Sequence, residues 1–143
     1  VVTPDDIEKE LKRINYSVKP LDIILINTSA GDYYGKPEFL SKGCGMGRDA
    51  TLYLTGKGEK ITVTDAWSWD APFIHTVNEF KKTKNSSLIW EGHRSGMEIG
   101  YCHIEKLTNL SKLPPFGYEI SCFPFKIKKA SAGFIRAVAI FMN

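Results

Sequence analysis

Apolar and polar positions near the start of the chain follow first a helical and then a strand-like pattern. Thr3 is a typical helix N-cap and Pro4 suits the first helical position, and apolar residues then recur at helical spacing on one face. The segment LDIILIN, over residues 21–27, is almost continuously apolar, which is typical of a buried strand with both faces covered. The opening of the chain therefore predicts a helix followed by a core strand.

The pattern after this strand predicts further helices and then mostly strands. The string GCGMGR, over 43–48, lacks the spacing of a phosphate-binding loop, so we interpret it as a turn leading into a helix. The apolar positions over 50–54 admit a helix or a strand, and a helix ending near Gly56 or Gly58 is favoured because glycine readily forms a left-handed cap. The other predicted elements are a strand over 61–64, a helix over about 72–82, and strands over 98–104, 118–127 and 133–142. This order predicts an α/β (or α+β) fold with a mixed sheet and flanking helices, in one domain over residues 1–143.

Composition and charge exclude several classes of protein. Of the 143 residues, 43% are hydrophobic and 24% are charged, which is typical of a globular chain and not of a disordered or coiled-coil one. No apolar run approaches the roughly 20 residues of a membrane-spanning helix, so no membrane partner is expected. The net charge is only +3, and we interpret Lys126, Lys128 and Lys129 as a solvated strand face, so no nucleic-acid partner is expected either. Three cysteines without a C-x-x-C pair indicate reduced thiols in a cytoplasmic protein.

The loop DAWSWDAP, over 65–72, concentrates polar and aromatic side chains directly after a predicted strand. Asp65 and Asp70 flank Ser68 in this loop, and Trp67 precedes the serine. Loops at strand ends often carry binding groups, which favours a functional interpretation. In the other interpretation the aspartates accept hydrogen bonds from turn amides while the indoles pack on the core. The spacing alone leaves both interpretations open.

Three histidines are the remaining candidates for chemistry. His75 falls in the predicted helix over 72–82, where a structural or surface role is favoured. His93 lies in the polar segment WEGHRSG, which we interpret as a loop, and His103 and Glu105 share one face if their segment is extended. Imidazole and carboxylate are ligands that zinc and manganese accept, but a stable site needs about three or four of them. The spacing alone therefore does not establish a metal site.

Four longer strings occur in order along the chain: GCGMGRDATLYL, VTDAWSWDAPF, WEGHRSGMEIGYCHIEKLTNL and LPPFGYEISCFPFKIKKASAGFIRAVAIF. Together they resemble the later part of the cyclase family that includes kynurenine formamidases of tryptophan catabolism and isatin hydrolases. The opening VTPDDIEKELKRINYSVKPLDIILINTSAGD is similar to that family's helix-then-strand segment. The resemblance thus runs from about Thr3 to Phe141, and several motifs in one order make it more specific than any single motif.

The resemblance implies a swivelling β/β/α fold and a metal-dependent hydrolase. In this family a divalent metal, zinc or manganese, activates water for attack on the carbonyl of an aryl formamide, a cyclic amide or a lactone. By position, His93 matches a metal-binding histidine of the family and Glu105 its metal-binding glutamate, with the family's separation of twelve residues. The residues that the resemblance places around the substrate, as shaping or orienting groups, are Asp65, Trp67, Ser68 and Asp70.

One signature of the family does not occur in these 143 residues. The motif H-x-G-T-H-x-D, which supplies further metal ligands in the family, is found nowhere in the sequence, and no acid–base histidine can be assigned. We therefore expect a C-terminal portion of a family domain whose N-terminal part is missing, with little hydrolase activity by itself. The leading hypothesis is that the parent protein is a metal-dependent hydrolase of a small carbonyl substrate, with a homo-oligomer or an upstream fragment as a possible source of the missing ligands. Two alternatives stay open: a split enzyme, in which a separate chain supplies those ligands, and a non-catalytic homologue that binds a small molecule or a partner chain.

Overall fold

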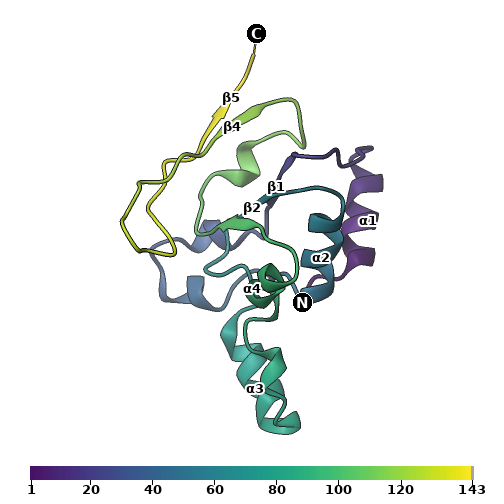
Figure 1. Cartoon of the computed structure of the whole chain (residues 1–143), viewed down its shortest axis with the longest axis vertical. Helices are drawn as coiled ribbons and strands as arrows, with labels where there is room; N and C mark the ends of the chain where they lie inside the picture. The colour runs from purple at the N-terminus through teal and green to yellow at the C-terminus, as the bar shows by residue number, and fades with distance from the viewer. Residues whose placement is uncertain (143) are drawn as a thin grey trace. The chain divides into compact units, whose positions relative to one another are not determined.

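The computed structural model describes residues 1–142, and the chain divides into two compact units, Val1–Lys112 and Leu113–Asn143. The first unit holds four helices and three strands (Figure 1), namely α1 (Pro4–Arg13), β1 (Ile23–Ile26), α2 (Arg48–Gly56), β2 (Ile61–Thr64), α3 (Phe73–Thr83), α4 (Glu91–Arg94) and β3 (Cys102–Ile104). Short 3₁₀ helices lie over Ala30–Tyr33, Pro37–Leu40, Ser86–Leu88, Ser95–Met97 and Leu110–Lys112. The second unit holds β4 (Glu119–Ser121) and β5 (Val138–Ile140).

The start of α1 and the end of α2 lie where the local sequence predicts them. The Thr3 hydroxyl accepts from the Asp6 amide at 3.3 Å, and the Asp6 carboxylate accepts from the Thr3 amide at 3.0 Å, so this pair forms a capping box at the start of α1. The predicted helix after GCGMGR is also confirmed, since α2 runs to Gly56. Gly58 follows it with a φ of +96°, a left-handed conformation that glycine adopts without steric cost.

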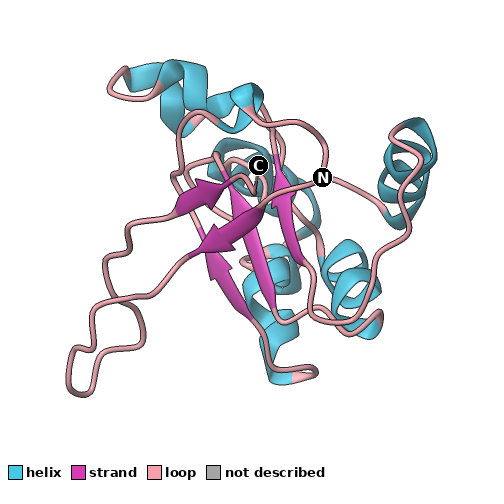
Figure 2. Ribbon diagram, turned by 90° about the horizontal axis from the view of Figure 1, so that it is seen from above, coloured by secondary structure: helices cyan, strands magenta, loops and turns pink. Residues whose placement is uncertain are grey.

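A parallel sheet of order β1-β2-β3 forms the centre of the first unit (Figure 2). The strand β2 coincides with the predicted segment 61–64, lies between the other two strands and is mostly buried. The strand β1 confirms the strand predicted within 21–27, but the expectation that both of its faces are covered is wrong. Only the alternate residues Ile24 and Ile26 pack against the hydrophobic core, and each of the four residues of β1 stays partly exposed.

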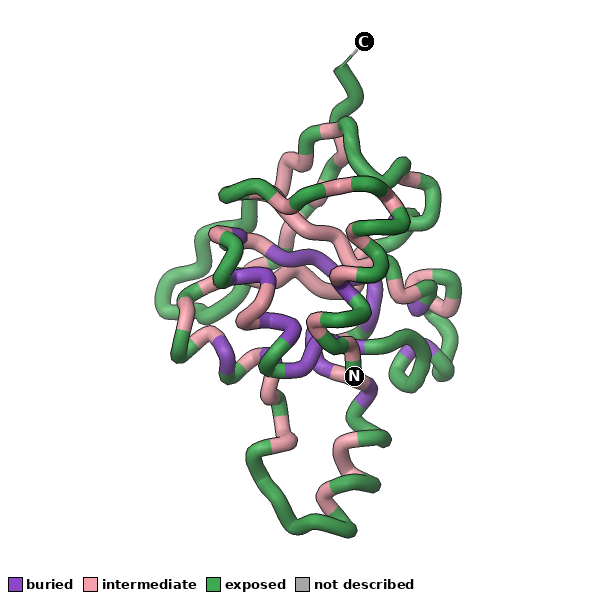
Figure 3. Tube along the Cα trace, turned by 90° about the vertical axis from the view of Figure 1, so that its right-hand side faces the viewer, coloured by how far each residue is buried: buried purple, intermediate pink, exposed green. Residues whose placement is uncertain are grey.

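The hydrophobic core of the first unit joins the helices α1 and α2 to the sheet and to the loop over 65–72. Its buried members are Ile7, Met46, Ala50, Leu54 and Trp69, and two side chains of β1, Ile24 and Ile26, pack against them. Figure 3 shows buried positions gathered in the interior of this unit, whereas α3 consists of exposed and partly exposed residues and has no buried residue. None of the helices in residues 1–142 is long and apolar enough to cross a membrane.

The strands of the later chain are shorter than predicted, and they do not join one mixed sheet. Of the segment 98–104 only Cys102–Ile104 is a strand, and β4 and β5 pair antiparallel with each other in a sheet of their own. Strand limits depend on where a partner backbone lies, which apolar periodicity does not specify. The interpretation of Lys126, Lys128 and Lys129 as a strand face is also wrong, because they are exposed beyond the end of β4.

Candidate metal centre

Polar residues follow the ends of the parallel strands and gather at one edge of the sheet. Asp65 comes directly after β2 and Glu105 directly after β3. Because the strands are parallel, their carboxyl ends meet at the same edge, which is where open α/β sheets bind ligands. The segment WEGHRSG, interpreted from its composition as a loop, contains α4, which packs against α2 and brings His93 to this edge.

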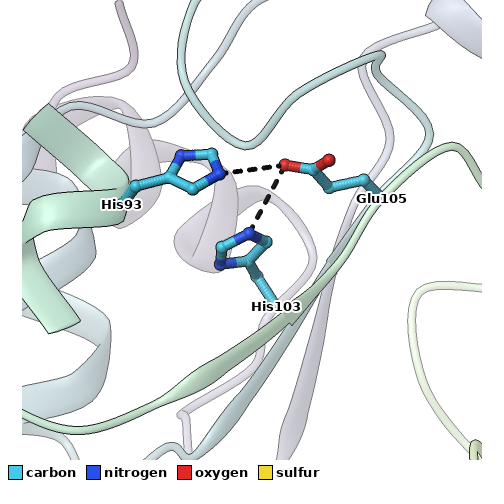
Figure 4. Close-up of side chains that lie close together, drawn as sticks. All are labelled: His93, His103 and Glu105. Carbon is cyan, nitrogen blue, oxygen red and sulfur yellow. Dashed lines mark ion pairs between the residues drawn. The ribbon is translucent and has the colours of Figure 1, made fainter. Parts of the chain in front are cut away.

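Three side chains converge there, His93 from α4, His103 from β3 and Glu105 from the end of that strand (Figure 4). The Nε2 atoms of His93 and His103 lie 3.5 Å and 3.4 Å from Oε1 of Glu105. All three ligand atoms of the group lie within 4.8 Å of one another. Two ligands bound tetrahedrally at about 2.1 Å from zinc are about 3.4 Å apart, so the spacing of these donors suits one shared metal ion.

Asp70 holds His93 and the start of α4 in position. Its Oδ1 accepts the Gly92 amide at 2.7 Å, and its Oδ2 accepts the His93 amide at 3.1 Å and contacts Nδ1 of the same imidazole. The Nδ1 contact leaves Nε2 of His93 facing Glu105. Metal-binding histidines commonly donate their second ring nitrogen to a carboxylate in this way, which fixes the tautomer and the orientation of the ring.

The Glu105 carboxylate is bound at both of its oxygens. Oε1 accepts the backbone amide of Trp69 at 2.8 Å, and Oε2 accepts the Lys106 ammonium at 2.8 Å. Burial by itself would raise the pKa of Glu105, but the hydrogen bonds from Lys106 and from the Trp69 amide hold that pKa below its usual value. Glu105 is therefore an anion at neutral pH, as a carboxylate ligand of a metal has to be.

The pKa values of the two histidines move in opposite directions. The hydrogen bond to Asp70 raises the pKa of His93, whereas burial, followed by the nearby His93, lowers the pKa of His103. His103 also stacks on the indole of Trp69, with ring centroids 6.2 Å apart. A neutral His103 can offer its lone pair to a metal at pH 7, and His93 does so once it has lost its proton.

A cavity of about 530 Å³ opens beside His93 and Glu105. Its walls include three aromatic side chains, Trp67, Phe73 and Trp90, each about half exposed. Apolar walls with a few polar groups are typical of sites for small molecules. The polar and charged residues in the wall, apart from His93 and Glu105, are Lys42, Ser68, Asp70, Thr76 and Lys106.

The loop over 65–72 combines both of the interpretations that its sequence allowed. Asp65 accepts hydrogen bonds from Thr28 and from the Gly31 amide, so it connects the end of β2 to the loop after β1. Trp69 is only 1% exposed and belongs to the core. Ser68, in contrast, lines the cavity together with its neighbour Trp67. Neighbouring residues of this loop thus have different roles: Trp69 packs in the core, whereas Trp67 and Ser68 line the cavity.

His103 is the member of this group that the sequence did not assign to metal binding. Its alternation with Glu105 was visible in the sequence, but a third donor had to come from another segment. The structure supplies that donor as His93, whereas His75 lies exposed on α3 and outside the group. Lys106 and Trp90 also lie at the cavity, and no motif in the sequence distinguished them.

The comparisons with known proteins concern the family and the fold of this chain. Residues 1–71 match the family model described as Putative cyclase, and no curated protein matches the chain. An isatin hydrolase bound to the product analogue thioisatinate superposes with a TM-score of 0.79 at 20% identity, covering 100% of this chain and 53% of that one. Isatin hydrolase A from Ralstonia solanacearum gives a TM-score of 0.76 at 20% identity, covering 99% and 53%.

A third structure, isatin hydrolase A from Labrenzia aggregata bound to benzyl benzoate, gives a TM-score of 0.74 at 18% identity, covering 99% of this chain and 54% of that one. The chain therefore spans about half the length of these isatin hydrolases and shares their fold over nearly its whole length. At 18–20% sequence identity, the similarity to these structures shows a shared fold and not a shared function. With the family model matching over residues 1–71, the chain belongs to the Putative cyclase family.

Proposed function

We propose that this chain forms part of the metal centre of a hydrolase that acts on aryl formamides, cyclic amides or lactones. The observation that carries the proposal is the convergence of His93, His103 and Glu105 at 3.4–3.5 Å, with Asp70 behind His93 and an aromatic cavity beside the group. When bound, zinc or manganese supplies polarisation of a carbonyl and a water of lowered pKa.

The residues of this chain would bind and orient rather than transfer protons. His93, His103 and Glu105 each offer one donor atom, and the hydrogen bond from Trp69 keeps Oε1 of Glu105 in place. The aromatic walls would stack on a ring of the substrate and exclude water from one face of it. Among residues 1–142, His93 is the only histidine lining the cavity, so the acid–base group of the reaction is not assigned to this chain.

The solved relatives support an aromatic carbonyl compound as the ligand class. Two of the isatin hydrolases carry thioisatinate and benzyl benzoate, both of which are ring-bearing carbonyl compounds. The cavity here has the aromatic lining that such rings require. Formamides, cyclic amides and lactones all present a carbonyl to a metal, so all three belong to the proposed substrate class.

Calorimetric titration of the purified chain with Zn²⁺ and with Mn²⁺ tests the metal centre. We expect one ion per chain, and a loss of affinity of at least about tenfold in His93→Ala, His103→Ala and Glu105→Gln. His75→Ala is the matched control, because His75 is exposed on α3 and should leave the affinity unchanged. Absence of binding, or binding that all three variants retain, would contradict the proposal and favour a binding module without a metal.

An activity measurement on the metal-loaded chain separates the remaining possibilities. We expect little hydrolysis of an aryl formamide by a preparation of verified mass, because the H-x-G-T-H-x-D ligands are not in this sequence. Robust metal-dependent hydrolysis would show that these residues suffice. Activity that appears only when a fragment containing that motif is added would support a split enzyme.

A further inference from the structure

Lys106 lines the cavity next to the candidate metal ligand Glu105. Its Nζ is 2.8 Å from Oε2 of Glu105 and 4.8 Å from the ring centroid of Trp67. All three residues line the cavity, and the Lys106 side chain is 39% exposed. One ammonium thus touches both the carboxylate at the metal group and the aromatic wall beside it.

The backbone at Lys106 is held in an uncommon conformation. Its φ is +63°, in the left-handed region that residues with a side chain seldom adopt. The conformation is stabilised by the Lys106 amide, which donates to the carbonyl of Ala66 at 3.0 Å, next to Trp67. This hydrogen bond connects the turn after β3 to the loop after β2. The backbone position of Lys106 is therefore fixed by contacts between two loops.

The two oxygens of Glu105 have different neighbours. Oε1 faces the imidazoles of His93 and His103, and Oε2 faces Lys106. An ammonium has three N–H donors, and the hydrogen bonds of residues 1–142 use one of them, on Oε2. Two donors remain for a ligand that enters the cavity beside Trp67.

We propose that Lys106 selects cavity ligands that carry a carboxylate on an aromatic ring. A ring stacked on Trp67 would place such a carboxylate next to the ammonium, and hydrogen bonds between ionised partners are stronger than those to a neutral group. A neutral amide of the same shape keeps the stacking and can still accept a hydrogen bond from the ammonium, but it loses the attraction between two opposite charges. This inference deepens the proposed function and rests on it for the identity of the cavity, but the selection itself needs no metal.

The test compares benzoate with benzamide, which have the same ring and nearly the same shape but differ in charge. Binding to the ¹⁵N-labelled full chain is followed by NMR in the presence of a metal chelator, with the indole signals of Trp67 and Trp90 as reporters. We expect benzoate to bind about fivefold more tightly than benzamide, which is modest because Glu105 partly neutralises the lysine. Increasing salt should weaken benzoate binding and leave benzamide binding unchanged.

Variants assign the preference to Lys106. Lys106→Met should abolish the preference for benzoate, so that the two affinities become equal, and Lys106→Arg should retain a preference because the positive charge stays. Lys57→Met is the matched control, since Lys57 also lies over a ring, that of Tyr53, and near a carboxylate, but outside the cavity. Lys42→Met tests the other lysine of the cavity wall, which lies over Tyr33.

Several results would overturn the proposal. Equal binding of benzoate and benzamide would do so, as would a preference that persists in Lys106→Met or disappears only in Lys42→Met. If Lys106→Met does not fold, Lys106→Gln and the salt dependence of the unmodified chain decide the question. Because these titrations contain no metal, their outcome is independent of the Zn²⁺ and Mn²⁺ titrations that test the proposed function.

Discussion

Glu59 makes the stability of this protein depend on pH in an unusual direction. It lies in the loop between α2 and β2 and is 0% exposed. Neither of its carboxylate oxygens has a regular hydrogen bond in residues 1–142. Burial raises the pKa of Glu59 from 4.5 to about 8, with a smaller contribution from the charge of Asp22 and a partly opposing one from the Ile24 backbone.

The sign of the effect follows from proton binding in the two states. Between the unfolded pKa of 4.5 and the folded pKa of about 8, the folded chain keeps a proton that the unfolded chain releases. The free energy of unfolding therefore falls as pH rises through this range, and the contribution of Glu59 levels off above it. A pKa difference of one unit corresponds to about 1.36 kcal/mol, so the free energy of unfolding falls by about 5 kcal/mol over the full range. This value is an upper bound, because water that reaches the ionised carboxylate would reduce it.

The variant Glu59→Gln keeps the shape of the side chain and removes the titration. We expect the variant to resemble the unmodified chain at pH 5 and to be more stable by several kcal/mol at pH 8. Urea unfolding at pH 5, 6, 7 and 8, followed by tryptophan fluorescence, measures both free energies. The histidines titrate in both proteins, so their contributions cancel in the difference.

Glu38→Gln is the matched control, because Glu38 is exposed and should give the same stability difference at every pH. Parallel pH profiles for the unmodified chain and Glu59→Gln would refute the reasoning. That result would mean that Glu59 is ionised in the folded chain at pH 5 and that its burial is relieved by contacts with water.

Two further changes test the metal group and the packing beside it. Asp70→Asn should weaken Zn²⁺ binding by about 10–100-fold, measured by competition with a chelator, because the imidazole of His93 loses its charged hydrogen-bond partner; an unchanged affinity would contradict that role. Gly45→Ala should destabilise the chain by about 3 kcal/mol or more in urea unfolding, because a Cβ there would lie 2.0 Å from the Ala71 amide nitrogen. Gly56→Ala, with nothing within 4 Å, should be neutral or slightly stabilising, and equal effects of the two alanines would contradict the packing argument.

The elements that were predicted well are those that depend on neighbours in the sequence. The start of α1 at Thr3 and Pro4 depends on a capping box closed within three residues. The end of α2 depends on a glycine two positions further along. Such interactions are local, so the residue types and their spacing are enough to predict them.

The strands show where this local information ends. The apolar runs predicted strands over 118–127 and 133–142, but β4 and β5 are much shorter and pair over three residues each. The segment around His93 was interpreted as a loop from its glycines and polar residues, and it contains α4 instead. In both cases the outcome depends on backbone or side-chain partners distant in the sequence, such as Asp70 at the start of α4.

The sequence alone determined the family, the start of α1 and the end of α2, the strand over 61–64 and the two ligand types, imidazole and carboxylate, that a metal could use. The tertiary structure decided which of them meet. It placed His93 beside His103 and Glu105. Asp65 accepts hydrogen bonds from the loop after β1, whereas Asp70 contacts the imidazole of His93. The ammonium of Lys106 lies over the ring of Trp67. The physical reason is that capping and periodicity act within a few residues, whereas a ligand group is assembled by the register of parallel strands and the packing of a helix far along the chain.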